Sequence, residues 1–598
     1  MVHAMRLPRW LTLVSAAGVS CGSPSGVHAP GQTARATELL APSPPAAPDP
    51  ARELASKVDA IFSSQSRSGV PGCAVGVYRA GQVLFSHGYG LANLEHGVPI
   101  KTNSVFDIAS ISKQFTAMAI LLLEREGKLS LDDDIRKYVP EIPDYGRPIR
   151  LHHLLHHTSG LRDYVPLLDL AGLENDVVTD DDLLFVLHQQ KALNFPTGTD
   201  WQYSNSGYFL LAVAVKRVTG MKFSAFAKER IFGPLGMKNT LILDDHTAVV
   251  RGRATGYVLR KDGNGFRTAI SRWEHAGASR VATTIDDLAR WDANFYDPRV
   301  GDRAMIERLR TPGKLDDGKP LNYALGLYEE TVNGRHVEQH TGGTGGYVSD
   351  LIRYPTERLT VACLCNVESD PDTNPPDLAP AVAELFLPAS PVTEVSETHD
   401  AGVADAAPSE KPKYVASAAE LAELAGSYYD PSTFIVRTLA PRDGRVLVSA
   451  QLEPGGPTRV YTPEGPRTLT VPGQSMRLVF EPATRSSPAH IIRTVEHEHP
   501  VQLVRFEPAT LSPSALAEYA GRYASDEFSR DLRLVVVGGK LRSATWGRTL
   551  DVDPFTTLAR DLFKSEEWGI QFERDRRGRI RDFLISGEGF RGIRFVRR

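Results

Sequence analysis

Two stretches of low-complexity sequence divide this chain and limit which parts of it can fold together. Residues 22 to about 50 are rich in Pro, Ala, Ser and Gly, and residues 388–412 form a second such stretch. A composition of this kind buries too little apolar surface to fold and is typical of linkers. The whole chain of 598 residues is also too long for a single core. We therefore expect one large domain over residues 51–387 and further folded units over residues 413–598.

The first 21 residues have the features of an export signal. Arg6 and Arg9 give a basic start, residues 11–20 form a short apolar stretch, and small residues precede Cys21. This pattern is similar to a bacterial lipoprotein signal, in which Cys21 would be lipidated and become the mature N-terminus. We expect an exported protein, a periplasmic or outer-membrane lipoprotein that meets the membrane only through its lipid anchor. If Cys21 is not lipidated, the chain is secreted.

The charge of the chain is nearly balanced. It contains 68 Lys and Arg residues against 72 Asp and Glu residues, a formal net charge of −4. Such a balance gives no long-range field that would gather nucleic acid. We therefore expect no nucleic-acid partner.

Four cysteines are too few for a disulfide framework, and no CxxC pair indicates a metal or redox site. Cys363 and Cys365 lie two apart in the apolar run of residues 359–365, hence on one face of a predicted strand. We expect both to be buried thiols. A bond from one of them to Cys73 is the alternative in an oxidising compartment.

Strands are predicted at both ends of residues 51–387 and helices between them. This order predicts an α+β domain in which one antiparallel sheet takes strands from both ends and is flanked by helices, with a helical insertion. The predicted strands are residues 73–78, 83–89, 323–329, 335–340, 346–354 and 359–365, and the predicted helices are residues 112–126, 180–189 and 207–218.

Beyond residue 412 the sequence repeats itself. Residues 421–428 (LAELAGSY) are echoed by residues 516–523 (LAEYAGRY), a displacement of 516 − 421 = 95 positions, and Arg505-Phe506 matches Arg594-Phe595. Both units carry short alternating segments separated by turns. We expect two small antiparallel β-barrel-like repeats, over residues 413–508 and 509–598.

A candidate nucleophile lies at the start of the first predicted helix. Ser110 and Lys113 are three residues apart, so a helix start places both side chains on one face. Lys113, if neutral, can remove the Ser110 proton, and amides at the helix start favour an oxyanion. Taken alone, the pair is also compatible with an ordinary capped helix.

Two further motifs favour the catalytic interpretation. Tyr203-Ser204-Asn205 follows a turn and precedes a helix, so Tyr203 can relay protons and the Asn205 amide can bind a peptide-like group. His340-Thr341-Gly342 ends a predicted strand and is followed by Gly343 and a glycine-rich turn, where a substrate can lie along the strand edge. A plain hairpin turn is the alternative for this stretch.

These motifs, in this order, resemble the class C β-lactamase-like family, which includes DD-peptidases, D-aminopeptidases and some esterases. The resemblance covers residues 52–387 and extends to residues 154–161 (LLHHTSGL) and 234–237 (PLGM). It implies the β-lactamase/transpeptidase-like fold and acyl transfer without a metal or cofactor. A catalytic domain followed by two small barrels also looks like the D-aminopeptidase subgroup.

The family resemblance implies a role for each motif residue. Ser110 is the nucleophile, Lys113 and Tyr203 transfer protons, and the backbone N–H groups of Ser110 and Gly343 form the oxyanion hole. The residues implied to bind substrate are Asn205, His340, Thr341 and Gly342. His152, His153, His156 and His157 form a second cluster, but no Glu stands between them as in His-Glu-x-x-His, which favours a structural role over a metal site.

His340 stands where β-lactamases of this class carry lysine, and an imidazole holds a carboxylate less strongly. We therefore expect an exported serine hydrolase acting on D-amino-acid peptides, cell-wall stem peptides or small esters. The alternatives are a D-aminopeptidase or a weak β-lactamase. A catalytically silent protein that binds peptide or cell wall is an alternative of another class. The expected partners are a peptide or small-molecule substrate, including peptidoglycan.

Overall fold

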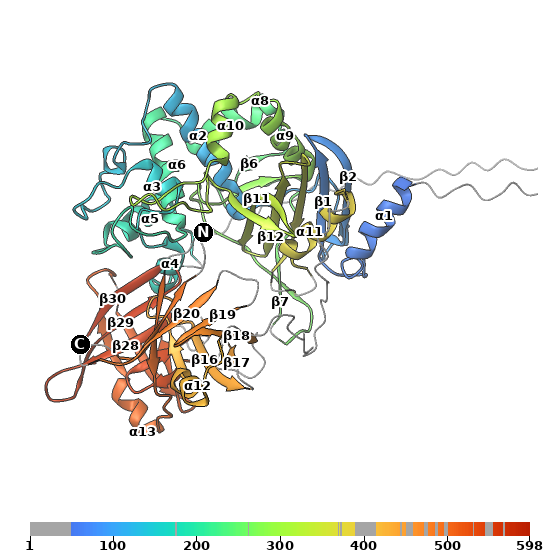
Figure 1. The fold of residues 1–598 in the computed structure, drawn as a ribbon. Coiled ribbons are helices and arrows are strands. Elements are labelled where there is room, and N and C mark those ends of the chain that lie inside the picture. Colours follow the sequence, from blue (N-terminus) through green and yellow to red (C-terminus); the bar gives the residue numbers. More distant parts are fainter. Residues whose placement is uncertain are drawn as a thin grey trace, which may run out of the picture. The chain divides into compact units, whose positions relative to one another are not determined.

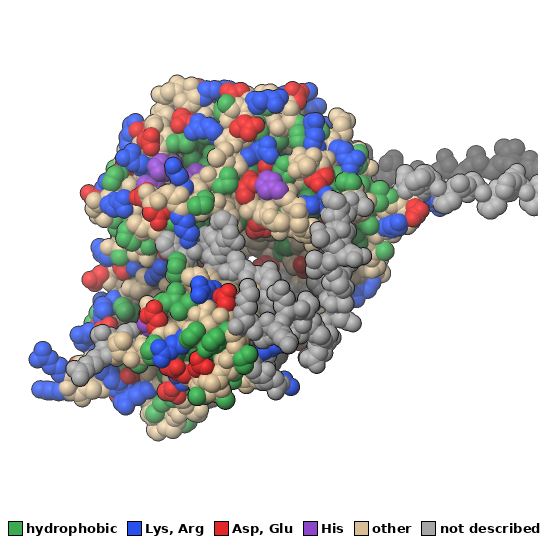
Figure 2. Space-filling view, viewed as in Figure 1, with side chains coloured by type: hydrophobic (Ala, Val, Ile, Leu, Met, Phe, Trp, Pro, Cys, Tyr) green, Lys and Arg blue, Asp and Glu red, His purple; other side chains and the backbone are tan. Residues whose placement is uncertain are grey.

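The computed structural model describes residues 50–173, 176–260, 262–368, 370, 373–388, 414–442, 445–449, 458–471, 476–484, 488–494, 500–529, 531–544, 554–565 and 568–598. The predicted signal peptide, Cys21 and nearly all of both predicted linkers lie outside these residues. None of the described helices has the length and apolar character needed to cross a membrane. On the face seen in Figure 2, acidic and basic side chains are interspersed.

The domain expected over residues 51–387 is built on one antiparallel sheet of six strands (Figure 1). The first strand, β1 (Cys73–Arg79), lies between β2 (Gln82–Tyr89) and β13 (Leu359–Cys365), which comes from the far end of the domain. This confirms the prediction that both ends contribute to one sheet. The other strands follow in the order β13, β12 (Tyr347–Tyr354), β11 (Arg335–Thr344) and β10 (Tyr328–Val332).

Helices cover both faces of this sheet. Side chains of β1 alternate, so Ala74 and Tyr78 join the core shared with the helical part, whereas Val75 and Val77 face the other core. Helices α1 (Pro50–Ile61) and α11 (Pro375–Phe386) contribute Val58 and Val382 to that second core. The strands β1, β12 and β13 are therefore buried on both sides, whereas much of the edge strand β2 is exposed.

The helical part centres on α2 (Lys113–Arg125), whose residues 113–123 are all buried, as expected for a helix surrounded by others. It packs with α6 (Asn205–Thr219) and α9 (Ile285–Tyr296) in the largest core. The other helices are α3 (Leu151–Leu155), α4 (Tyr164–Leu170), α5 (Asp180–His188), α7 (Phe223–Ala227), α8 (Gly233–Leu235) and α10 (Arg303–Arg310). The short strands are β3 (Leu91–Asn93), β4 (Val98–Pro99), β5 (Phe106–Asp107), β6 (Leu241–Ile242), β7 (Tyr257–Leu259), β8 (Phe266–Thr268), β9 (Val281–Thr283) and β14 (Val367–Glu368).

One predicted strand is wrong. Residues 323–327 were expected to begin a strand, but β10 starts at Tyr328. The apolar run is explained by burial, because Tyr323, Leu325 and Leu327 all belong to the protein interior without forming that strand. An apolar run indicates a buried segment, and its length alone does not separate a strand from a buried loop.

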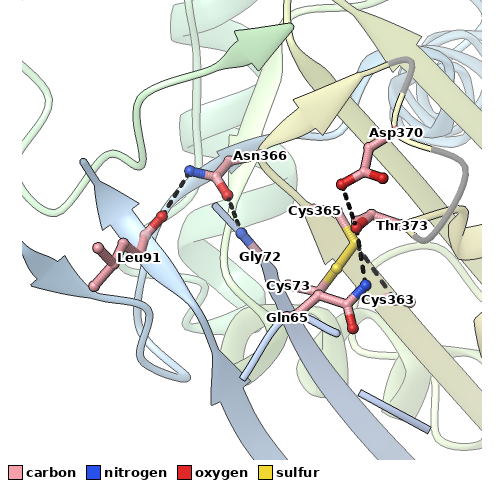
Figure 3. Close-up of a disulfide and its surroundings, with 9 residues drawn as sticks. All are labelled: Gln65, Gly72, Cys73, Leu91, Cys363, Cys365, Asn366, Asp370 and Thr373. Atoms are coloured by element: carbon pink, nitrogen blue, oxygen red, sulfur yellow. Dashed lines mark hydrogen bonds between the residues drawn. A yellow bond between two sulfur atoms is a disulfide. The ribbon is translucent and has the colours of Figure 1, made fainter. Parts of the chain in front are cut away.

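A disulfide joins β1 and β13, which in chain order are the first and last strands of the six-stranded sheet (Figure 3). Cys73 and Cys365 face each other in the register of β1 and β13 and are bonded, whereas Cys363 is a free, buried thiol. The expectation that Cys365 is a thiol is therefore wrong, and the alternative bond to Cys73 is present. Burial raises the pKa of Cys363, whose Sγ atom lies 3.8 Å from that of Cys365.

The C-terminal part consists of two eight-stranded antiparallel units, coloured orange to red in Figure 1, as predicted. The first is a closed barrel that follows α12 (Ala418–Leu424): β15 (Gly426–Tyr429), β16 (Val436–Arg442), β17 (Arg445–Ser449), β18 (Thr458–Gly465), β19 (Thr468–Thr470), β20 (Arg477–Glu481), β21 (His490–Thr494) and β22 (Val501–Phe506). The second follows α13 (Pro513–Leu516): β23 (Gly521–Ala524), β24 (Leu532–Val537), β25 (Lys540–Ala544), β26 (Thr556–Ala559), β27 (Leu562–Lys564), β28 (Trp568–Arg574), β29 (Ile580–Gly587) and β30 (Phe590–Arg597).

The repeat in the sequence corresponds to a repeat in hydrogen bonding. Tyr428 donates to the Leu424 carbonyl at 3.0 Å, and Tyr523 donates to the Tyr519 carbonyl at 2.9 Å. At the other end of the repeat, Tyr428 pairs with Arg505, whereas Tyr523 pairs with Arg597. Arg597, not Arg594, is thus the structural counterpart of Arg505.

The disulfide is expected to stabilise the domain strongly, because it joins residues 292 positions apart. Replacing Cys73 and Cys365 together by Ala should lower the free energy of unfolding by about 2–5 kcal/mol, measured by chemical denaturation without reductant. Cys363→Ala, which removes the neighbouring buried thiol and leaves the bond intact, is the matched control. Equal denaturation midpoints for the double variant and this control would contradict the expectation.

Candidate active site

Ser110 lies on a constrained turn immediately before α2. It belongs to the 3-10 turn Ala109–Ser112, and Ala109 has a positive φ of 46°, a conformation that costs energy for a residue with a Cβ atom. The Ala109 N–H donates to Asp107 at 3.0 Å. Asp107 in turn forms a fully buried ion pair with Arg280 at 3.1 Å. The backbone around Ser110 is therefore held by buried polar partners.

Lys113 is the centre of the site. Its Nζ atom donates to Ser110 Oγ at 3.0 Å, to Asn205 Oδ1 at 2.8 Å and to the Ala278 carbonyl at 2.8 Å. The side chain is fully buried, and burial lowers the pKa of Lys113 to about 7, although the negative charge of Asp163 opposes this shift. Lys113 is thus close to half neutral at physiological pH and lies within reach of the Ser110 proton.

Tyr203 approaches Ser110 and Lys113 from the start of α6. The Lys113 Nζ atom lies 4.7 Å from the centre of the Tyr203 ring. Among the described residues, no group meets hydrogen-bond geometry at the buried Tyr203 hydroxyl, although Ser110 is near enough to lower its pKa in part. Burial outweighs this and raises the pKa of Tyr203 well above its ordinary value. Tyr203 is therefore a neutral phenol, able to donate a proton.

The third motif lies within β11 rather than after it. Residues 341–344 continue the strand and pair with β12, whereas the pairing of β10 with β11 stops at Gln339. The edge of β11 beyond Gln339 is thus left without a β10 partner, and an extended substrate can bind along such an edge. Gly342 is required by packing, because a Cβ atom there would lie 2.3 Å from the Ile108 carbonyl oxygen beside the nucleophile turn.

His340 is buried and both of its ring nitrogens are engaged. Nδ1 lies 2.6 Å from the Thr341 carbonyl oxygen, which can only accept, so Nδ1 carries the hydrogen. Nε2 then accepts from the Tyr323 hydroxyl at 3.1 Å. Burial, together with the charge of Lys113, lowers the pKa of His340 to about 3. The imidazole is therefore neutral at physiological pH and brings no positive charge to the third motif.

The structure brings Ser110, Lys113, Tyr203, Asn205 and His340 together, from segments up to 230 positions apart by subtraction. Two further residues of this cluster, Asp163 and Tyr323, were not predicted from the sequence. Asp163 accepts hydrogen bonds from the Asn205 side chain and backbone, both at 2.8 Å. No motif marks either residue, although Asp163 lies two positions after the conspicuous LLHHTSGL segment of residues 154–161.

The histidine cluster beside this segment supports the backbone. His153 Nδ1 accepts from the Arg150 N–H at 3.1 Å, and His157 Nδ1 accepts from the Ser204 N–H at 3.2 Å. The His157 ring also packs 4.4 Å from that of Tyr203, centre to centre. Within the described ranges, the groups of His, Cys, Asp or Glu close enough to share a metal ion are Cys73/Cys363/Cys365 and Asp245/His246/Glu274.

A sequence model of the beta-lactamase family matches residues 55–385, more than half of the chain. The chain belongs to the beta-lactamase family. Among its relatives in this family, penicillin-binding protein 4* of Bacillus subtilis is 33% identical over 320 residues, covering 51% of this chain and 70% of that protein. D-aminopeptidase of Brucella canis is 27% identical over 546 residues, covering 88% of this chain and 96% of its own length.

The fold is also that of a known structure. The octameric penicillin-binding protein homologue from Pyrococcus abyssi matches with a TM-score of 0.50 at 22% identity, covering 76% of this chain and 99% of that one. This likeness shows a shared fold. The protein is thus a beta-lactamase family hydrolase, related to penicillin-binding proteins and D-aminopeptidases.

The protonation state of Lys113 should govern the reactivity of Ser110 in this beta-lactamase family member. The rate of labelling by a fluorophosphonate should rise with pH, about tenfold per unit below the Lys113 pKa, and level off above about 7. Intact mass against time measures the rate. Ser110→Ala should take no label, and Lys113→Met should react about 10²–10⁴-fold more slowly. A flat profile between pH 5 and 9 would exclude Lys113 as the base.

Proposed function

We propose that this hydrolase cleaves amide bonds of short peptides and amides that begin with a D-amino acid, through an acyl-enzyme on Ser110. The observation that carries the acyl-enzyme is the buried Lys113 Nζ atom, 3.0 Å from Ser110 Oγ and with a pKa of about 7. A base that is half neutral near physiological pH can accept the hydroxyl proton as the oxygen attacks a carbonyl.

The proposed reaction has two steps. In acylation, Ser110 Oγ bonds to the substrate carbonyl carbon, its proton passes to Lys113, and the backbone N–H groups of Ser110 and Gly343 bind the oxyanion. The C–N bond then breaks, and the amine leaves with the proton held by Lys113, passed on directly or through the Tyr203 hydroxyl, so that Lys113 is neutral again. In deacylation, water adds to the ester carbonyl and gives a proton to Lys113. The C–O bond to Ser110 then breaks, and Lys113 returns the proton to Ser110 Oγ as the acid leaves.

The similarity to D-aminopeptidase supports the choice of substrate. That match covers 88% of this chain, more than the catalytic domain alone, whereas the match to penicillin-binding protein 4* covers 51%. Cell-wall stem peptides and small esters are the other substrates that the same chemistry accepts. Fold alone does not select among them.

A neutral His340 argues against substrates that depend on a carboxylate contact at the third motif, which includes efficient β-lactam turnover. Two esters with the same acyl group, one with a free carboxylate on the leaving group and one with the corresponding methylamide, should give kcat/KM values within about threefold. A charged hydrogen bond at this position would favour the carboxylate by about 10- to 100-fold. Such a preference, or rapid penicillin hydrolysis, would contradict the assignment.

Glu588 supports recognition of a free amino group. It lies in the turn between β29 and β30, and its side chain is exposed. Burial is the main reason that the pKa of Tyr328 is raised, and the charges of Glu330 and Glu588 add to this effect. The Tyr328 ring is in turn 5.4 Å from the His340 ring, centre to centre. An acidic side chain near the third motif suits the ammonium group of a D-aminoacyl substrate.

Glu588→Gln should lower kcat/KM for D-alanine p-nitroanilide by about tenfold, since a charge-assisted contact is lost. N-acetyl-D-alanine p-nitroanilide, which has no ammonium group, should be hydrolysed equally by the variant and the parent. Initial rates of nitroaniline release measure both. Equal losses on the two substrates would instead indicate a general disturbance of the site and would remove Glu588 from substrate recognition.

We also propose that the protein works outside the cytoplasm. The buried Cys73–Cys365 bond supports this, since such bonds form and persist in oxidising compartments. The signal-like sequence of residues 1–21 agrees, and lipidation of Cys21 is part of the same proposal.

A further inference from the structure

Asp163 lies at the N-terminus of α4 and accepts more hydrogen bonds than an N-cap residue needs. It is the N-cap of α4 and accepts from the Val165 N–H at 2.8 Å through Oδ1. Its Oδ2 atom accepts both the backbone N–H and the side-chain Nδ2 of Asn205, each at 2.8 Å. The side chain is buried. Burial raises the pKa of Asp163, whereas the three hydrogen-bond donors and the charge of Lys113 oppose this and favour the ionised carboxylate.

Through these bonds Asp163 fixes the orientation of the Asn205 amide. Asn205 Oδ1 accepts from Lys113, and Asn205 Nδ2 donates to Asp163. A flipped amide would direct NH₂ at the lysine ammonium and oxygen at the carboxylate, two repulsive contacts. Lys113, Asn205 and Asp163 thus form one polarised chain that begins at the nucleophile's base.

The second C-terminal repeat holds Asp163 from the other side. The Gly589 carbonyl, in the turn between β29 and β30, accepts the Asp163 N–H at 2.8 Å and the Asn194 side chain at 2.9 Å. Gly589 has φ of +87°, and a Cβ atom there would lie 2.7 Å from Asp163 Cβ. The preceding residue, Arg162, forms a buried ion pair with Glu527 of the same repeat.

We propose that Asp163 is a positioning residue for acyl transfer, which orients the Asn205 amide and the Lys113 ammonium, and that the Gly589 turn of the second repeat keeps it in place. The proposal rests on the proposed acyl-enzyme at Ser110. It gives the C-terminal repeat a part in the chemistry of a site whose reacting side chains all come from the catalytic domain.

The charge of Asp163 provides a readout that a purely structural cap would not affect. Asp163 raises the pKa of Lys113 against the effect of burial, so removing its charge should lower that pKa. The other titratable groups around Lys113 are neutral near pH 7, because burial lowers the pKa of both histidines and raises the pKa of both tyrosines: His157, His340, Tyr203 and Tyr208. Asp163 is therefore the charge that dominates the acid limb of the pH–rate profile.

The test is the pH dependence of Ser110 labelling by a fluorophosphonate in the full chain, followed by intact mass. In Asp163→Asn, either amide orientation directs an NH₂ group at an N–H donor, of Asn205 or of Val165. The acid limb should move to lower pH by at least half a unit, and the rate on the plateau should fall about 10- to 100-fold. Asp302→Asn is the matched control: Asp302 caps α10 through the Met305 N–H and should leave the profile unchanged.

A second variant disturbs Asp163 without changing a charge. Gly589→Ala places a Cβ atom against Asp163 and should slow the plateau rate about 3- to 30-fold, with a shift of the acid limb in the same direction. Gly592→Ala is its control, because Gly592 has φ of +61° and no atom within 4 Å of the added Cβ position. If Asp163→Asn does not fold, the comparison of Gly589→Ala with Gly592→Ala tests the proposal.

Each outcome bears on the proposal. Unchanged profiles in Asp163→Asn, or equal effects of Gly589→Ala and Gly592→Ala, would overturn it. Labelling does not depend on the peptide substrate, so a wild-type protein that labels at Ser110 but cleaves no D-aminoacyl amide would refute only the proposed substrate. A wild-type protein that takes no label at any pH would overturn the acyl-enzyme and the positioning role together.

Discussion

Burial of the Lys113 amino group is the constraint on which the rest of the site depends. An ammonium group removed from water is costly unless it finds hydrogen-bond acceptors, and here the acceptors come from the nucleophile turn, the start of α6 and the segment before β9. These three segments must meet at one point for the lysine to be tolerated. The same burial lowers the pKa of Lys113 to about 7, which suits a catalytic base. The hydrogen bonds that make the buried lysine tolerable therefore also set its reactivity.

Much of the fold could be predicted because periodic apolar segments record burial. Such segments predict strands over residues 73–78 and 359–365 and a helix over residues 112–126, close to the observed β1, β13 and α2. Three ordered motifs contain five residues that the structure brings together. Asp163 and Tyr323 were missed because each is a single polar residue whose partner is distant in sequence. Periodicity also assigned Cys365 to a buried face but could not supply the register that places it opposite Cys73.

In the C-terminal repeats, the sequence match predicts the two units but not every pair of equivalent residues. The match of residues 421–428 with 516–523 located both units, and the tyrosine hydrogen bonds are equivalent. Arg505 corresponds to Arg597, a displacement of 92 rather than 95 positions, so the second unit is three residues shorter between these points. The Arg-Phe match placed the counterpart at Arg594, a displacement of 594 − 505 = 89 positions, because the same two residue types recur there. The strand pairing identifies Arg597 as the equivalent residue.

Because β1 lies between β2 and β13, its position in the sheet affects how the domain folds during synthesis. This strand is synthesised early, yet one of its two neighbours, β13, ends at residue 365. Until that segment has left the ribosome, one edge of a strand that is buried except for Arg79 has no partner and can pair with other chains. The sheet can close only when nearly the whole domain is available, which makes the nascent chain dependent on whatever shields that edge during synthesis.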